Sequence, residues 1–242
     1  TIASTPYEGE ELFAMVEDNA TVAAPISSFQ SFLSGQDHLA SPQKNNRFAC
    51  TQTFLGTISG ATILTIGGGT QNNSSTLGSI LGGSDNTNTG NCSVVAGGKS
   101  NTASGNNSIA GGGKSNTSSG NCSSVLGGNC NTASGECSTI VGGDTNTASG
   151  NDSFIGAGEK NTVSSVMGTI AAGCSNTVSS TCSFIGGGHD NAATGATSSI
   201  VGGEANQTRG QFSSLVGGVS SCAIGKASFV GGGTCNCVTG LS

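Results

Sequence analysis

A glycine recurs every 15 residues through most of this 242-residue chain, and this period constrains the fold more than any other feature. The series contains twelve glycines: Gly68, Gly83, Gly98, Gly113, Gly128, Gly143, Gly158, Gly173, Gly188, Gly203, Gly218 and Gly233. The residue before each is also glycine, except for Ala157 and Ala172. A fixed period of this length indicates a repeat protein in which each unit packs on its neighbours in sequence.

The unit follows the pattern G-x-x-S-x-I-x-G-G-x-x-N-T-A-S, in which serine, an aliphatic residue and glycine alternate with the period of two that is typical of a strand. With 42 glycines, no Trp and one Tyr, the chain cannot build a conventional core of large side chains. We therefore predict an all-β fold, a parallel β-roll or β-helix solenoid of twelve 15-residue coils from about Ile63 onwards. Each coil should have a strand in S-x-I-x-G and an extended stretch in N-T-A-S. Coils stacked about 4.8 Å apart would form a rod of about 55–60 Å.

Asparagine occupies one position of the unit in nearly every coil. The row consists of Asn86, Asn101, Asn116, Asn131, Asn146, Asn161, Asn176, Asn191 and Asn206. Stacked amides can form a ladder in which each side chain bonds the next coil. The alternative is that each asparagine is a left-handed turn residue, and both interpretations are structural.

The two faces of the first strand differ in composition. One face, represented by Ser93, Val95 and Gly97, is small, aliphatic and small, which suits the inside of a flattened roll. On the other face two positions exchange volume within each coil: Phe154 is followed by Gly156, whereas Ser124 is followed by Leu126. Constant volume is a property of packed interfaces. We therefore predict a subunit interface made by Leu81, Leu126, Val141, Phe154, Phe184, Val201, Val216 and Phe229.

A stripe of this kind is most simply buried against copies of the same chain around an axis, which predicts a homo-oligomer. The alternative is a wider monomeric β-helix with this face inside and the serine face outside.

The repeat, clearest from Asn91 to Gly150, resembles the left-handed parallel β-roll of YadA-like heads in trimeric autotransporter adhesins. Similar repeats occur in tail and capsid fibres of phages and large viruses. The resemblance covers about three quarters of the chain and implies a homotrimer with an apolar axis. The family's units are usually shorter and often have Ala where this chain has Gly-Gly and Asn-Thr, so the resemblance implies no ligand.

Residues 1–60 lack the repeat and are expected to form an attachment or capping segment, followed by a repeat domain at 61–242. The runs Glu11 to Val16 and Thr21 to Ile26 predict a β-hairpin. Residues 27–34 are expected to form a short helical turn and residues 36–46 a polar loop. The stretch that begins at Tyr7 resembles leader segments of phage tail fibres, which join the repeats to an adjoining fibre or particle protein.

Ten cysteines are present, and four of them form two pairs at equivalent positions one coil apart: Cys122 with Cys137, and Cys222 with Cys237. The stacking distance of about 4.8 Å falls within the Cα separation of about 4.4–6.8 Å that disulfides allow. These pairs could be covalent links between coils. The alternative is that they are free thiols, since other coils have Thr, Asn, Asp or Met at the first of these positions.

No catalytic group is evident. The two histidines, His38 and His189, lie in different regions, and the Gly-Gly pairs lack the Lys-Ser or Lys-Thr of a phosphate loop. The spacing of Cys222, Cys235 and Cys237 does not make a metal site without a nearby histidine. We expect no enzymatic activity, cofactor or metal. A net charge of −6 argues against nucleic-acid binding, and no apolar run is long enough to cross a membrane.

We therefore expect a structural or adhesive fibre protein, foremost a trimeric virion fibre that acts as a rigid spacer or binds a host-surface receptor. A bacterial surface adhesin head is the first alternative. Ice binding is an alternative of another class, because the stacked N-T-A-S segments resemble the flat threonine arrays of insect antifreeze β-helices. The threonine row comprises Thr87, Thr102, Thr117, Thr132, Thr147, Thr162 and Thr177.

Overall fold

The structure is a computed structural model that describes residues 12–17, 20–25, 65–66, 69, 72–74 and 77–240. Backbone contacts divide the chain into two units, residues 1–57 and 58–242. Each unit is described by itself. The helical turn and polar loop predicted for residues 27–46, and the leader segment at Tyr7, lie outside the described residues.

The described part of the first unit is a β-hairpin. Strand β1 (Leu12–Glu17) pairs antiparallel with β2 (Ala20–Pro25), in a register that places Leu12 opposite Pro25 and Glu17 opposite Ala20. Two residues connect the strands, the length of the commonest hairpin loops. The predicted hairpin is thus confirmed, with strand bounds shifted by one residue.

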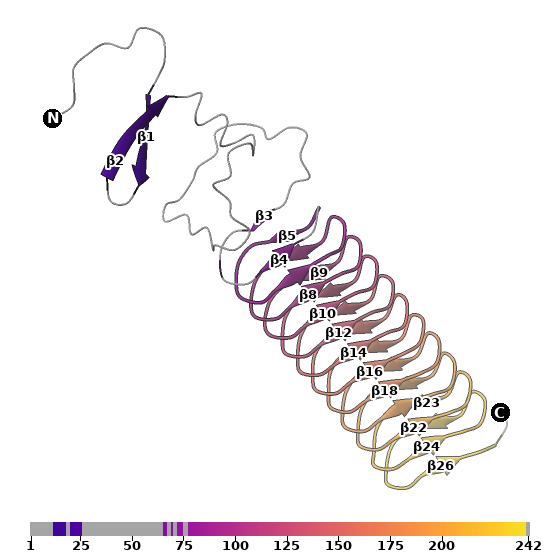
Figure 1. Ribbon diagram of the computed structural model, residues 1–242. Coiled ribbons are helices and arrows are strands. Elements are labelled where there is room, and N and C mark those ends of the chain that lie inside the picture. The colour runs from indigo at the N-terminus through magenta and orange to yellow at the C-terminus, as the bar shows by residue number, and fades with distance from the viewer. Residues whose placement is uncertain are drawn as a thin grey trace. The chain divides into compact units, whose positions relative to one another are not determined.

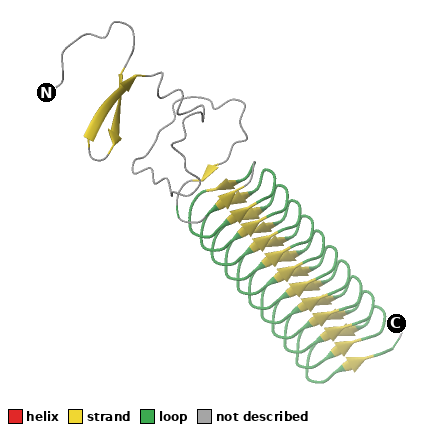
Figure 2. Ribbon diagram, in the orientation of Figure 1, coloured by secondary structure: helices red, strands yellow, loops and turns green. Residues whose placement is uncertain are grey.

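The second unit is a parallel β-solenoid, in which each turn of the chain adds one strand to each of two sheets (Figures 1 and 2). The first sheet contains β3 (Thr65–Ile66), β5 (Ser79–Ile80), β7 (Val94–Val95), β9 (Ile109–Ala110), β11 (Ser124–Val125), β13 (Thr139–Ile140), β15 (Phe154–Ile155), β17 (Thr169–Ile170), β19 (Phe184–Ile185), β21 (Ser199–Ile200), β23 (Ser214–Leu215) and β25 (Phe229–Val230). The second sheet contains β4 (Asn73–Ser74), β6 (Thr87–Asn88), β8 (Thr102–Ala103), β10 (Thr117–Ser118), β12 (Thr132–Ala133), β14 (Thr147–Ala148), β16 (Thr162–Val163), β18 (Thr177–Val178), β20 (Ala192–Ala193), β22 (Gln207–Thr208), β24 (Cys222–Ala223) and β26 (Cys237–Val238). Each sheet has twelve strands, so the predicted all-β solenoid is confirmed.

The step between the first two coils is one residue shorter than the others. Thr65 pairs with Ser79, 14 residues away, whereas Ser79 pairs with Val94, 15 residues away. The equivalent of Gly83 is therefore Gly69, not Gly68 as the spacing of glycines predicts. Gly69 has a φ of 92°, within the range of the later corner glycines. Two adjacent glycines precede Gly69, so the period of 15 finds a glycine although the coil is shorter.

The core is a single narrow layer between the two sheets. The first sheet contributes mostly Ile and Val, such as Ile140 and Ile155, and the second contributes small residues such as Ala133 and Ala148; all four are fully buried. Serines of the same inward face, such as Ser138, are also buried, and the Ser138 hydroxyl donates a hydrogen bond to the Gly135 carbonyl. The alternative with the serine face outside is therefore wrong.

One coil lacks the buried serine and shows why the core stays uniform. At Gly168, an added Cβ would lie 2.6 Å from Cγ1 of Val163 and 2.9 Å from Cγ1 of Val178. These two coils have Val where most coils have the smaller Ala on the second sheet. Because protein interiors are close-packed, the larger valines occupy the space that the serine side chain fills elsewhere.

The corner between the sheets contains a third line of parallel pairing that the sequence pattern did not reveal. Single-residue bridges connect consecutive coils at Ser84, Lys99, Lys114, Asn129, Asp144, Glu159, Cys174, His189, Glu204, Val219 and Thr234, which we call the rim row. The residue after each rim residue up to Val219 and Thr234 has a positive φ, for example 55° at Cys130 and 57° at Thr145. The sharp turn therefore falls next to the asparagine row and not on it.

Candidate functional site: the outward faces of the solenoid

The outward face of the β3–β25 sheet has large apolar side chains along its length. We call this set the apolar stripe: Leu81, Ile109, Leu126, Val141, Phe154, Phe184, Val201, Val216 and Phe229. In the single chain Leu126 is 51% exposed and Phe229 is 63% exposed. All eight residues of the predicted interface belong to this stripe, and Ile109 adds a ninth. Exposed apolar surface that continues over so many coils is typical of a surface that binds a partner.

The exchange of volume along the stripe has a local packing cause. A Cβ placed on Gly156 would lie 3.5 Å from the ring carbon Cε1 of Phe154, and one on Gly186 would lie 3.4 Å from that of Phe184. Each phenylalanine ring therefore extends over the glycine two residues later. In coils such as that of Leu126, the first position is a small residue and the second is large. Each coil thus places one large apolar group on the stripe, which keeps the surface even.

The outward face of the β4–β26 sheet is polar and almost uncharged. We call it the threonine face: Thr87, Thr102, Thr117, Thr132, Thr147, Thr162 and Thr177, half-buried, each followed two residues later by an exposed Thr or Ser. Register pairs such as Thr132 with Thr147 align these side chains one above another. The row changes at Ala192 and Gln207, which continue the same register. The face is therefore regular over seven coils.

The predicted asparagine row forms a buried ladder. Asn146 is representative: its Oδ1 accepts a hydrogen bond from the backbone N–H of Asn161 at 2.9 Å. Its Nδ2 donates to the carbonyl of Gly142 at 3.1 Å and to that of Gly158, one coil on, at 2.8 Å. The side chain is fully buried. Each amide therefore connects neighbouring coils and satisfies backbone groups at the corner that have no partner in a sheet.

The ladder extends beyond the nine predicted asparagines. Asn72 accepts from the N–H of Asn86 at 3.1 Å, which adds a residue at the start of the solenoid. Towards the other end the N–H of Ser221 donates to Asn206, and the N–H of Asn236 donates to the hydroxyl of Ser221. The signal for Asn72 was hidden by the shorter first coil. Ser221 substitutes an oxygen acceptor of another side chain at the same position.

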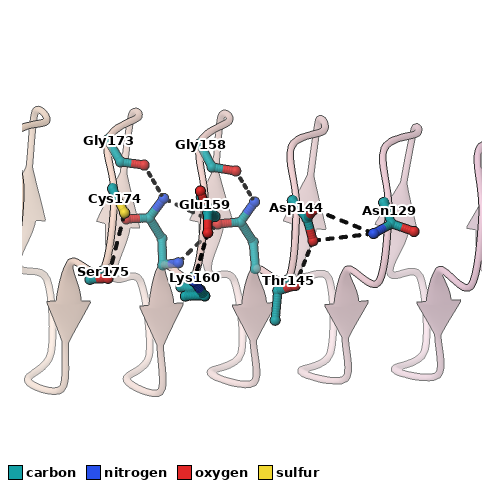
Figure 3. Close-up of polar contacts among 11 residues, drawn as sticks. Asn129, Asp144, Thr145, Gly158, Glu159, Lys160, Gly173, Cys174 and Ser175 are labelled. Carbon is teal, nitrogen blue, oxygen red and sulfur yellow. Dashed lines mark hydrogen bonds and ion pairs between the residues drawn. The ribbon is translucent and has the colours of Figure 1, made fainter.

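The charged residues of the described coils lie mainly along the rim and pair locally (Figure 3). Asp144 accepts hydrogen bonds from the hydroxyl of Thr145 at 2.5 Å and from the amide of Asn129 at 3.3 Å, which lower the pKa of its carboxyl group. Lys160 donates to Glu159 at 2.7 Å, and this hydrogen bond raises the pKa of Lys160. These groups are exposed, so their contribution to stability is small.

His189 lies on the same rim, 3.2 Å from a carboxylate oxygen of Asp190. His38 lies outside the described residues. Within the described coils no three His, Cys, Asp or Glu side chains are grouped so that they could hold a metal ion. The same residues contain no helix that could cross a membrane.

The two predicted cysteine pairs are stacked on adjacent coils. Cys222 and Cys237 are register partners in β24 and β26, and their sulfur atoms are 2.7 Å apart. The hydrogen bond with Cys237 raises the pKa of the Cys222 thiol. Cys122 and Cys137 share one turn position, and the pKa of Cys137 is raised by desolvation and then by the neighbouring Cys122.

Comparison with known proteins adds no identity to this description. No protein-family model matches the sequence, and no curated protein is significantly similar to it. The fold and its outward faces therefore define the class of protein, a parallel β-solenoid with 15-residue coils, and the functional argument depends on those faces.

Proposed function

We propose that this protein is a structural module of an extracellular fibre, in which three copies of the solenoid pack their apolar stripes around a common axis. The observation that carries the proposal is the apolar stripe, because it leaves large side chains such as Leu126 and Val201 more than half exposed in a single chain. Burial of such side chains contributes about 1.5–3 kcal/mol each. Repeated over the coils, this drives association strongly.

The type of fibre follows from the repeat. Its resemblance to YadA-like β-rolls supports a trimer, and the similar repeats of phage and viral fibres make a virion fibre the first candidate. A rod of about 55 Å made of stacked coils suits a rigid spacer, with a host-surface receptor as its ligand. The first unit would join the fibre to an adjoining particle protein. A bacterial adhesin head is the alternative, and antibodies against residues 77–240 that label projections on virus particles, and not bacterial surfaces, would exclude it.

A non-enzymatic role is part of the same proposal. Catalysis requires a nucleophile, a base and an orienting group converging on one point. The described carboxylates and His189 are instead spread along an exposed rim and engage their immediate neighbours. We propose no cofactor for this protein.

The trimer is tested by native mass. Light scattering of the full chain is expected to give three times the chain mass of 23.3 kDa. The double variant Leu126→Lys/Val141→Lys places two charges on the apolar stripe and should reduce the mass to that of one chain, since unpaired charges are costly in an interface. The matched control Thr132→Lys/Thr147→Lys adds the same charges to the threonine face of neighbouring coils and should retain the trimer.

Two results would contradict this model. A wild-type mass of 23.3 kDa would show that the stripe is not an interface between copies. A Leu126→Lys/Val141→Lys variant with the wild-type mass would place the interface on another face. Circular dichroism should show the same β-rich spectrum for all three proteins, because the substituted side chains face solvent in the single chain.

Ice binding is a second candidate, favoured by the threonine face alone. Its hydroxyl-bearing side chains repeat at the coil spacing on a sheet without charges over seven coils. If this face binds ice, the purified chain should produce freezing-point hysteresis. The Thr132→Lys/Thr147→Lys variant should then lose the effect, whereas the Leu126→Lys/Val141→Lys variant should keep it. Absence of hysteresis in the wild-type protein would exclude this function.

A further inference from the structure

The described coils contain nine cysteines, and their surroundings separate them into two groups. Cys222 is aligned with Cys237 on the next coil, and Cys122 is aligned with Cys137. The other five, Cys92, Cys130, Cys174, Cys182 and Cys235, have no cysteine at the equivalent position of an adjacent coil. The two aligned pairs can therefore react within the chain, and the remaining five serve as internal controls.

The geometry of the Cys222–Cys237 pair is set by the parallel sheet. Strands β24 and β26 are neighbours, so the two Cα atoms are separated by the parallel strand spacing of about 4.8 Å, which lies within the range that disulfides allow. The two side chains point to the same face, and their sulfur atoms are in contact at 2.7 Å. Cys237 is exposed and Cys222 is partly exposed, so an oxidant can reach them.

The Cys122–Cys137 pair lies at a turn and not in a strand. The backbone N–H of Cys137 donates to the carbonyl of Asn121 at 2.8 Å, which holds the two turns together. Both cysteines have the same left-handed backbone conformation, with φ of 55° and 54°. Equal conformations direct the two side chains in parallel. Both thiols are exposed.

We propose that Cys222–Cys237 and Cys122–Cys137 are sites of coil-to-coil disulfide formation, with a low-molecular-weight disulfide such as oxidised glutathione as the oxidant. One thiolate attacks the oxidant, which forms a mixed disulfide and releases one reduced thiol. The partner thiolate then attacks the protein sulfur of the mixed disulfide and releases the second reduced thiol. The protein loses two protons and two electrons, and the oxidant gains them.

The link at Cys222–Cys237 would stabilise the part of the solenoid that is packed least. Both residues of β26 are exposed, whereas earlier strands of the same sheet have a buried second residue. A covalent bond to β24 would keep this coil from detaching. The inference is independent of the proposed fibre function, since it depends only on the alignment of coils within one chain.

Peptide mapping tests the assignment directly. The full chain is incubated with oxidised glutathione at a pH near 9, where thiolates form, then alkylated, digested with trypsin and analysed by mass spectrometry without reduction. Cleavage after Arg209 and Lys226 separates Cys222 from Cys235 and Cys237. We expect a linked pair of these two peptides, and the link should persist in Cys235→Ser and disappear in Cys237→Ser.

The second pair lies within the tryptic peptide of residues 115–160, which contains Cys122, Cys130 and Cys137. This peptide should become lighter by two hydrogen atoms and carry one alkyl group, on Cys130. Cys92 and Cys182, which occupy the same turn position as Cys122, should be fully alkylated. Equal alkylation of all cysteines, or only intermolecular links on a non-reducing gel, would overturn the proposal.

Hydrogen exchange reports the consequence of the bond. In the oxidised protein, exchange of the amides of residues 237–239 should slow at least several-fold relative to the reduced protein. Cys237→Ser should show the fast exchange under both conditions, and Cys182→Ser should behave like the wild type. If oxidation leaves the exchange rate at these amides unchanged, the bond does not fasten this coil.

Discussion

Replacement of Asn146 by aspartate is expected to destabilise the solenoid by about 3 kcal/mol or more at neutral pH, because it places an unpaired negative charge in a buried site. The Asn146 amide donates to two carbonyl oxygens and accepts from one N–H, and the side chain is fully buried. An ionised carboxylate cannot donate. Its second oxygen would face the carbonyls of Gly142 and Gly158, which repel it.

The effect should depend on pH in a defined direction. Burial and the two carbonyls favour the protonated carboxyl group, so the pKa of Asp at this position in the folded state lies above its unfolded value of about 3.9. The penalty is absent below the unfolded pKa, grows as the pH rises through it, and is complete above the folded pKa. The difference in thermal stability between wild type and Asn146→Asp should therefore be small near pH 3 and large at pH 7.

Two further variants separate the charge from the lost hydrogen bonds. Asn146→Ala removes the same amide without adding charge, so its destabilisation should be similar at both pH values. Asn107→Asp makes the same chemical change at an exposed turn position where another coil has Asp152, and its effect should stay within about 0.5 kcal/mol. Equal melting temperatures for Asn146→Asp and wild type at pH 7 would show that the ladder does not hold the coils together.

Gly143→Ala is expected to cost about 3 kcal/mol or more, whereas Gly142→Ala, one residue earlier, should be nearly neutral. Gly143 has a φ of 99°, which is unfavourable for any residue with a Cβ. A Cβ there would also lie 2.1 Å from the carbonyl oxygen of Gly158 and 2.6 Å from Nδ2 of Asn146. The substitution would therefore strain the backbone and disrupt the asparagine ladder.

Gly142 provides a matched control within the same Gly-Gly pair. A Cβ on Gly142 would meet nothing within 4 Å, and Ala157 and Ala172 occupy the same position in two other coils. Chemical denaturation of the two variants gives both free energies of unfolding under identical conditions. Equal stabilities for Gly143→Ala and Gly142→Ala would contradict the view that close approach of the corner backbone requires the second glycine.

The period of 15, the two strands of each coil and the inward serine and aliphatic positions could all be predicted from the residues. These features are local: alternation along a strand reports which side chains share a face, and glycine reports where the chain turns. The same alternation also placed Phe154 and Leu126 on one outward face, since residues two apart in a strand point the same way.

Features that depend on contact between coils required the tertiary structure. The glycine series could not show that the first coil has 14 residues, because adjacent glycines satisfied the period of 15, and Asn72 was missed for that reason. Single-residue bridges along the rim leave no alternation to detect.

By itself the sequence determined the repeating unit, its strands and the division of its side chains into inward and outward sets, because these follow from the order of residues within a coil. Only the tertiary structure decided that the asparagine amides bond two coils at once, that the ring of Phe154 covers Gly156, and that the sulfur of Cys222 meets that of Cys237. These contacts depend on the path of the backbone and on side-chain conformations, which bring together atoms from residues that are neighbours in the stack and not in the sequence.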